Sequence, residues 1–169
     1  MLHTAMDADE QPFGRDALES LVSADLRDMS TESDQIGRLF AVSQELRPTD
    51  FRALLHIMVA ETAGRPITSG GLTERMGLSG AGITYLVDRL IESGHIRRDS
   101  HPADRRKVIL RYSEPGLDTA RLFFNPLRAH TRAAMSDLPD ADLAAAHRVF
   151  TAIIGAMRHF QTELDDARR

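Results

Sequence analysis

Small and hydroxyl-bearing side chains gather where a helix is predicted to begin. They are Ser79, Gly80, Ala81, Gly82, Thr84 and Tyr85, with Asp88 and Arg89 further along the same face and Thr68 and Ser69 at the start of the preceding predicted helix. Small residues let a helix backbone approach the floor of a nucleic-acid groove, and hydroxyl groups can donate hydrogen bonds to phosphates or base edges. The free N–H groups at a helix start also favour an anion such as phosphate. These residue types indicate non-covalent contact with DNA.

Cationic side chains gather at the tip of a predicted hairpin, in the run Arg105, Arg106 and Lys107. An arginine at the tip of a thin hairpin can enter the minor groove of DNA, where the negative potential is strongest. The surrounding segment, residues 97–111, contains six cationic residues and two acidic ones. A local basic patch of this kind is what phosphate binding requires.

The net charge of the whole chain is −4, which by itself argues against a nucleic-acid partner. The charge is unevenly distributed, because residues 1–34 hold nine acidic residues and two arginines, a balance of −7. Residues 68–112 hold eight basic and five acidic residues, a balance of +3. The acidic total therefore comes from the N-terminal extension, and the segment with the candidate DNA contacts is basic.

The elements that position these residues follow from hydrophobic periodicity and capping residues. A short helix is predicted around residues 18–26, interrupted by the polar run 30–34, and a second helix over 36–46. Thr49-Asp50 is predicted to cap the next helix, which ends near Gly64. The stretch 65–67 is predicted to be extended.

Two short helices and a hairpin come next. Thr68 is predicted to cap a brief helix that ends at Gly77, because glycine readily adopts the left-handed conformation of a helix C-terminus. Ser79 is predicted to cap the clearest helix of the chain, which Gly94 stops; its apolar face is formed by Ile83, Leu86, Val87, Leu90 and Ile91. Residues 96–98 and 108–112 are predicted strands joined by a turn at 101–104.

Two long helices are predicted at the end of the chain. The first runs over about 115–135 and contains Pro126, which we expect to kink or break it. The second begins at Pro139, a residue favoured in the first turn of a helix. The predicted fold is therefore mainly α-helical with one small β-hairpin, and its order over 49–112 fits a winged helix-turn-helix.

The segment 67–116 resembles the MarR family of bacterial transcription regulators. The resemblance rests on Asp88-Arg89-Leu90 and Gly94 after the recognition helix, on Asp104-Arg105-Arg106 in the wing, and on Glu114-Pro115-Gly116 before the next helix. It implies a DNA-binding regulator, more often a repressor than an activator. It also implies a homodimer that binds a pseudo-palindromic site in double-stranded DNA.

The resemblance further implies a domain organisation and two finer roles. Residues 49–114 would form the DNA-binding domain, 33–48 and 115–165 the helical dimerisation region, and 1–32 an acidic, partly disordered extension. Asp88 would pair with Arg106 and brace the wing. A small aromatic or anionic ligand would contact Thr84 and Arg98 and release the DNA.

Other activities receive less support from the residues. The seven histidines are scattered, no catalytic triad or phosphate-binding glycine loop is present, and a zinc site from His56 and His130 has little support, so we expect no enzyme, metal or cofactor. The absence of cysteine, of a secretory signal and of a long apolar run predicts a cytoplasmic protein without a membrane partner. One alternative remains open, a winged-helix module that contacts proteins through the same face and binds no DNA.

Overall fold

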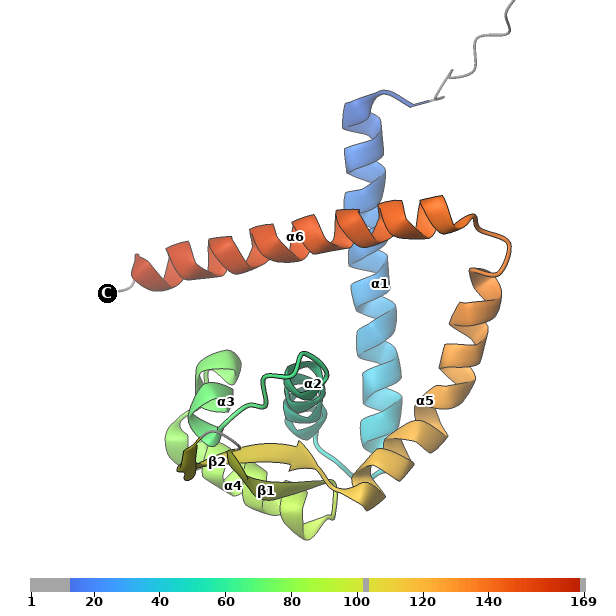
Figure 1. Cartoon of the computed structure of the whole chain (residues 1–169). Helices are drawn as coiled ribbons and strands as arrows, with labels where there is room; N and C mark the ends of the chain where they lie inside the picture. Colours follow the sequence, from blue (N-terminus) through green and yellow to red (C-terminus); the bar gives the residue numbers. More distant parts are fainter. Residues whose placement is uncertain (1–12, 102–103, 168–169) are drawn as a thin grey trace, which may run out of the picture. The chain divides into compact units, whose positions relative to one another are not determined.

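The computed structural model describes residues 13–101 and 104–167, with Arg105 and Arg106 described by their backbone alone (Figure 1). The order of elements is α1 (Arg15–Ser43), α2 (Pro48–Thr62), α3 (Ser69–Met76), α4 (Gly80–Glu92), β1 (Ile96–His101), β2 (Asp104–Tyr112), α5 (Glu114–Ala134) and α6 (Asp140–Asp166). The chain divides into two compact units, the first ending at Ala120 and the second beginning at Arg121. The predicted fold class is confirmed: six helices and one antiparallel hairpin are present in the described part of the chain.

Helix α1 is a single helix of 29 residues, so the predicted interruption at 30–34 is wrong. This run contains neither glycine nor proline, and exposed polar residues lower helix stability only slightly. Within this run, the Thr31 hydroxyl donates to the carbonyl oxygen of Arg27 at 3.0 Å. Earlier in the helix, the Ser23 hydroxyl donates to the carbonyl oxygen of Glu19 at 2.8 Å. Both hydroxyl groups therefore find their hydrogen-bond acceptors in the helix itself. The predicted boundary between residues 32 and 33 therefore falls inside a continuous helix. Residues 1–12 of the predicted disordered extension lie outside the described residues.

The C-terminal part of α1 packs closely on α2. Gly37 lies against the ring of Phe51, and a Cβ atom at residue 37 would overlap that ring. The rings of Phe40 and Phe51 are tilted at 55° with centroids 5.7 Å apart, a favourable aromatic geometry. Helix α2 begins at Pro48 and not at a Thr49-Asp50 cap, because proline suits the first helical position.

The core of the first unit is aliphatic and is shared by α2, α3, α4 and the hairpin. Its least exposed side chains are Leu54, Ile57, Leu72, Ile83, Leu90, Ile96, Ile109 and Leu110. Burying each such side chain contributes about 1.5–3 kcal/mol relative to leaving it in water. This core fixes the three helices and the hairpin to one another.

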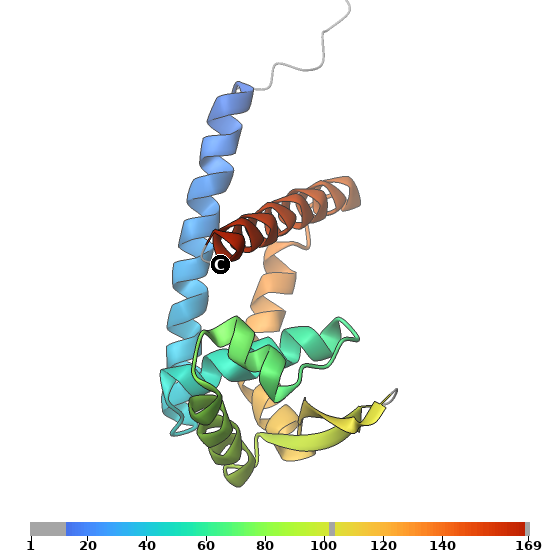
Figure 2. The ribbon, with the colours of Figure 1, turned by 90° about the vertical axis from the view of Figure 1, so that its left-hand side faces the viewer.

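The hairpin pairs Ile96 with Tyr112 and continues in register to Ser100 opposite Val108. It projects from the end of α4 as a narrow two-stranded arm (Figure 2). The predicted extended stretch before α3 joins it: the amide of Leu110 donates to the carbonyl oxygen of Ile67 at 2.8 Å, and Thr68 bridges to Ile109. The base of the hairpin is thereby tied to the start of α3.

Helices α5 and α6 follow the hairpin. Helix α5 continues through Pro126, so it does not break there; the kink, the other predicted outcome, stays a prediction. Pro139 is the residue before the first turn of α6. Among the residues that the structure describes, no helix is long and apolar enough to cross a membrane.

Candidate nucleic-acid interface

Helices α3 and α4 are joined by a tight turn, and both begin with the predicted caps. The amide of Gly71 donates to Thr68 Oγ1 at 3.1 Å, and the amide of Gly82 donates to Ser79 Oγ at 3.2 Å. Gly77 ends α3 in the left-handed conformation, with φ of 64°. The predicted helix-turn-helix is confirmed in its caps and its turn.

Helix α4 separates its residues into a buried face and an exposed face. Its buried residues are Ile83, Leu86, Val87 and Leu90, as predicted from their spacing. All of the predicted contact residues in its first turns are exposed: Ser79, Gly80, Ala81, Gly82, Thr84 and Tyr85. Thr84 donates its hydroxyl to the carbonyl oxygen of Gly80 at 3.0 Å, and Tyr85 has 62% of its surface exposed. The structure therefore brings these side chains together on one solvent-facing surface.

The remaining predicted DNA contacts lie on α3 and the wing. Thr68 and Ser69 are half-buried at the start of α3, and Lys107 is exposed on β2. The side chains of Arg105 and Arg106 lie outside the described residues, so the predicted pair between Asp88 and Arg106 stays a prediction.

The described partner of Asp88 is Arg98 on β1. The Arg98 Nη2 atom donates to Asp88 Oδ1 at 2.7 Å, and both side chains are exposed by 46%. This contact links the recognition helix to the first strand of the wing. A half-exposed ion pair of this kind adds little to folding stability, about 0–1 kcal/mol.

A second set of contacts anchors the other strand to α2. Arg111 Nη1 donates to Glu61 Oε1 at 2.8 Å, and the Tyr112 hydroxyl donates to the carbonyl oxygen of Leu54 at 3.1 Å. Burial raises the pKa of Tyr112, with a smaller contribution from the negative charge of Glu61. The hydroxyl is therefore a permanent donor, and the strand is held against α2. Sequence spacing could not reveal these contacts, since the partners lie 50 or more residues apart.

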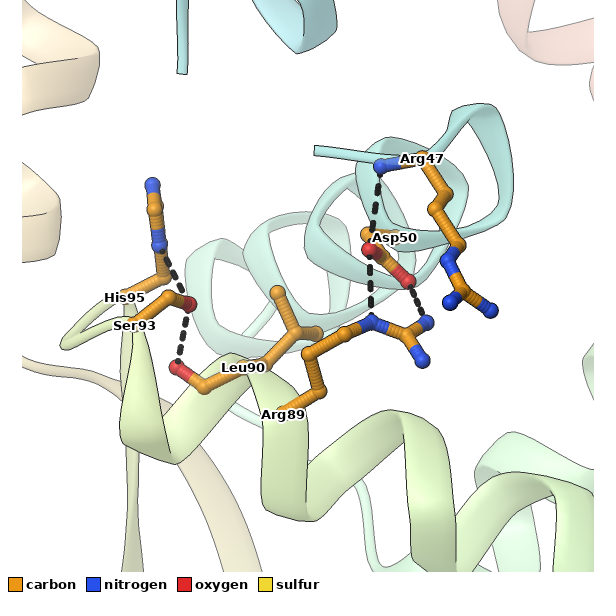
Figure 3. Close-up of polar contacts among 6 residues, drawn as sticks. All are labelled: Arg47, Asp50, Arg89, Leu90, Ser93 and His95. Atoms are coloured by element: carbon orange, nitrogen blue, oxygen red, sulfur yellow. Dashed lines mark hydrogen bonds and ion pairs between the residues drawn. The ribbon is translucent and has the colours of Figure 1, made fainter. Parts of the chain in front are cut away.

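The position of Arg89 corrects the sequence analysis, which placed it on the exposed face of α4. Its side chain is turned toward α2, where Nε donates to Asp50 Oδ2 at 3.0 Å and Nη2 donates to Asp50 Oδ1 (Figure 3). The Asp50 carboxylate also accepts a hydrogen bond from the amide of Arg47 at 3.1 Å. The hydrogen bond with Asp50 raises the pKa of Arg89. The correction has a simple reason: at the edge of the apolar face, a long side chain can reach a carboxylate on the neighbouring helix.

His95 occupies the junction between α4, β1 and α5. It is only 7% exposed, and its Nδ1 atom lies 2.9 Å from Ser93 Oγ (Figure 3). Burial lowers the pKa of His95, against a smaller opposing effect of Asp50. Gly116 at the start of α5 lies directly against the His95 backbone. A Cβ atom at residue 116 would therefore overlap the His95 carbonyl group. This close approach explains the glycine of the Glu114-Pro115-Gly116 sequence.

Within residues 13–101 and 104–167, no group of three histidine, aspartate or glutamate side chains is arranged to hold a metal ion. The arrangement can bind a groove and its phosphates through α4 and the wing.

A helix-turn-helix with a hairpin wing defines the fold class of this protein as a winged helix-turn-helix. Residues 45–107 match the family model described as MarR family. A curated relative from Bacillus subtilis (strain 168), an uncharacterized HTH-type transcriptional regulator named YcgE, is 29% identical over 129 residues, which cover 76% of this chain and 81% of the relative. The chain is therefore similar to MarR family regulators, most specifically over residues 45–107.

Solved structures show the same fold. A mutant of MepR from a multidrug-resistant S. aureus clinical isolate matches with a TM-score of 0.64 at 13% identity, over 80% of this chain and 96% of that one. A MarR family protein from Bacillus stearothermophilus matches with a TM-score of 0.59 at 19% identity, over 86% of this chain and 99% of that one. The family consists of DNA-binding transcription regulators and not of enzymes.

Proposed function

We propose that this protein is a repressor that binds a pseudo-palindromic operator in double-stranded DNA as a homodimer. The observation that carries the proposal is the exposed start of α4, where capped amides, small residues and hydroxyl groups face solvent above a fully buried apolar face. This surface has the shape and the hydrogen-bonding groups that a major groove requires. A bound repressor would exclude RNA polymerase from an overlapping promoter.

The wing supplies the second half of the proposed contact. Lys107 on β2 is exposed, and the backbone of the hairpin carries Arg105 and Arg106 next to it. We assign these three cations to phosphates and to the minor groove. Each phosphate contact steepens the dependence of log K on log salt concentration by about 0.9.

The homodimer is supported by apolar side chains that the chain leaves exposed on α6. They are Phe150, Ile154, Met157, Phe160 and Leu164, which follow one another at helical spacing. An apolar stripe of this length on a regulator requires a protein partner, because scattered single residues are normal on surfaces but contiguous rows are not. A second copy supplies the identical stripe and satisfies the two-fold symmetry of a pseudo-palindromic site.

Release of DNA by a small aromatic or anionic ligand forms part of the proposal. Arg98 holds Asp88 across the gap between β1 and α4. A ligand carboxylate at Arg98, with Thr84 one helical turn before Asp88 on α4, would compete with Asp88 and free the wing from α4. Benzoate is a suitable probe: it should dissociate the wild-type complex, whereas the variant Arg98→Gln, which lacks the ion pair with Asp88, should bind DNA more weakly and no longer respond to benzoate.

A gel shift on the DNA upstream of the protein's own gene, repeated across salt concentrations, tests the central claim. We expect retardation that weakens steeply with salt. The variant Arg106→Ala should lose about 1–3 kcal/mol of DNA binding. Arg15→Ala is the matched control, because it removes the same charge at the exposed start of α1. Absence of retardation at low salt would favour the alternative, a module that contacts proteins only.

A further inference from the structure

The ion pair of Asp50 and Arg89 lies directly beneath the exposed surface of α4. Asp50 is 1% exposed, and its two carboxylate oxygens accept hydrogen bonds from Nε and Nη2 of Arg89. The carboxylate is itself fixed, because it also accepts a hydrogen bond from the amide of Arg47, the residue that precedes α2. A two-point contact between a guanidinium and a carboxylate sets orientation as well as distance. Arg89 is therefore held rigidly from below.

The guanidinium of Arg89 has few hydrogen-bond donors available for DNA. Two of its three nitrogen atoms bind Asp50, and the third, Nη1, is buried without a hydrogen-bond partner among the described residues. The side chain is 23% exposed. Reaching a phosphate would leave the Asp50 carboxylate buried and unpaired, which is strongly unfavourable.

Tyr85 lies on the other side of the same guanidinium. The Cζ atom of Arg89 is 5.1 Å from the centroid of the Tyr85 ring, within range of a cation–π contact. Arg89 follows Tyr85 by four positions along α4, so both belong to one face of the helix. An exposed tyrosine without such support would sample several rotamers and lose that freedom on binding. Stacking on Arg89 selects the orientation before DNA arrives.

We infer that Arg89 is a positioning residue and does not contact DNA: Asp50 orients Arg89, and Arg89 orients Tyr85 toward the DNA. The inference rests on the proposed DNA-binding function. It assigns to Tyr85 the contact with base edges or sugars, and it assigns to Asp50, a residue of α2 far from the groove, an indirect effect on affinity.

The salt dependence of binding separates positioning from contact. The probe is a duplex of about 30 base pairs, long enough for two half-sites, selected from a random library by the wild-type protein and measured by fluorescence anisotropy. We expect Arg89→Lys, which keeps the charge but not the two-point geometry, to bind about tenfold more weakly with an unchanged salt slope. The matched control is Lys107→Gln, whose slope should fall by about 0.9.

Direct contact by Arg89 would give the opposite pattern. Arg89→Lys would then retain affinity, Arg89→Gln would lower the salt slope by about 0.9, and Asp50→Asn would bind as tightly as the wild type or more tightly. Any of these results overturns the inference. Positioning requires Asp50→Asn to weaken binding with an unchanged slope.

A double-mutant cycle measures the coupling between Tyr85 and Arg89 in DNA binding, which a purely structural role of Arg89 would not produce. Tyr85→Ala should weaken DNA binding about tenfold in the wild-type background and less than about twofold in the Arg89→Lys background, because the ring is already unsupported there. Equal effects in both backgrounds overturn the inference. Thermal unfolding of each variant checks that the head is folded at the assay temperature. If Asp50→Asn is unfolded, the double-mutant cycle of Arg89→Lys and Tyr85→Ala, whose Tyr85 site is exposed, still tests the inference. Failure of the selection to enrich any duplex refutes the proposed function instead.

Discussion

The winged head, from α2 to β2, and helix α6 differ in what they bury. In the head, Leu54, Leu72, Leu90 and Ile109 are at most 1% exposed, and the helices and the hairpin share one core. Helix α6 has 27 residues, all described, and none of them is buried. Both segments carry apolar stripes at helical spacing, so the pattern alone does not separate them. The difference indicates that the head folds on contacts within the chain, whereas the exposed stripe of α6 is what the proposed homodimer would cover.

The largest effect is expected from a cavity in the head. Leu90→Ala should lower the free energy of unfolding by about 2–5 kcal/mol, because it removes buried methyl groups and leaves a void. Val42→Ala, at a position 77% exposed on α1, is the matched control and should change it by less than about 0.5 kcal/mol. Urea unfolding at one fixed protein concentration measures both, and equal losses would contradict the contrast between the head and the exposed surface.

A charge placed on the apolar stripe of α6 tests whether that stripe forms the proposed dimer interface. Ile154→Glu should weaken the proposed dimer at least about tenfold, since a carboxylate would be buried at the interface without a partner. Ala152→Glu adds the same charge toward the opposite face of α6 and should leave the dimer intact. Sedimentation equilibrium gives the dissociation constants. A dimer that tolerates both substitutions would exclude this stripe as the interface.

The smallest effect concerns the buried histidine of the head. Because burial lowers the pKa of His95 below its ordinary value of 6.5, the unfolded chain takes up a proton at a higher pH than the folded chain. The stability from a neutral His95 is thus fully present above about pH 6.5 and is lost as the pH falls through that value toward the lower, folded-state pKa.

The variant His95→Gln should therefore lose less stability than the wild type between about pH 7.5 and about pH 5. His56, whose pKa is also lowered, first by burial and then by the charges of Arg75 and Arg52, adds a loss of the same sign that remains in the variant. Urea unfolding at the two pH values measures the difference. Identical losses in the two proteins would show that His95 does not titrate as proposed.

Local chemistry was sufficient to predict much of the head. Ser79 and Thr68 cap their helices, Gly77 adopts the left-handed turn, and the spacing of Ile83, Leu86 and Leu90 identifies the buried face of α4. Each of these features depends on residues within a few positions of one another, so spacing and residue type are enough. The exposed contact surface of α4 follows from the same periodicity.

Length and continuity of helices were predicted less well. The polar run in α1 was predicted to interrupt a helix, and Pro126 was predicted to kink or break α5, yet each helix is continuous. A few unfavourable residues cost a helix little compared with the many backbone hydrogen bonds on either side of them. The predicted cap of α2 at Thr49-Asp50 was also wrong. Asp50 lies in the first turn of the helix, where its carboxylate accepts hydrogen bonds from the amide of Arg47 and from the side chain of the distant Arg89.

The sequence by itself determined the resemblance to the MarR family, the helix-turn-helix, the wing and the basic character of the head, because capping, periodicity and motif spacing are local properties. Only the tertiary structure decided the partners of the charged side chains: Arg89 with Asp50, Arg98 with Asp88, and Arg111 with Glu61. A charged side chain at the edge of an apolar face can point to solvent or to a neighbouring helix. The packing of the elements selects between the two, since it alone brings a carboxylate 39 residues away into contact with Arg89.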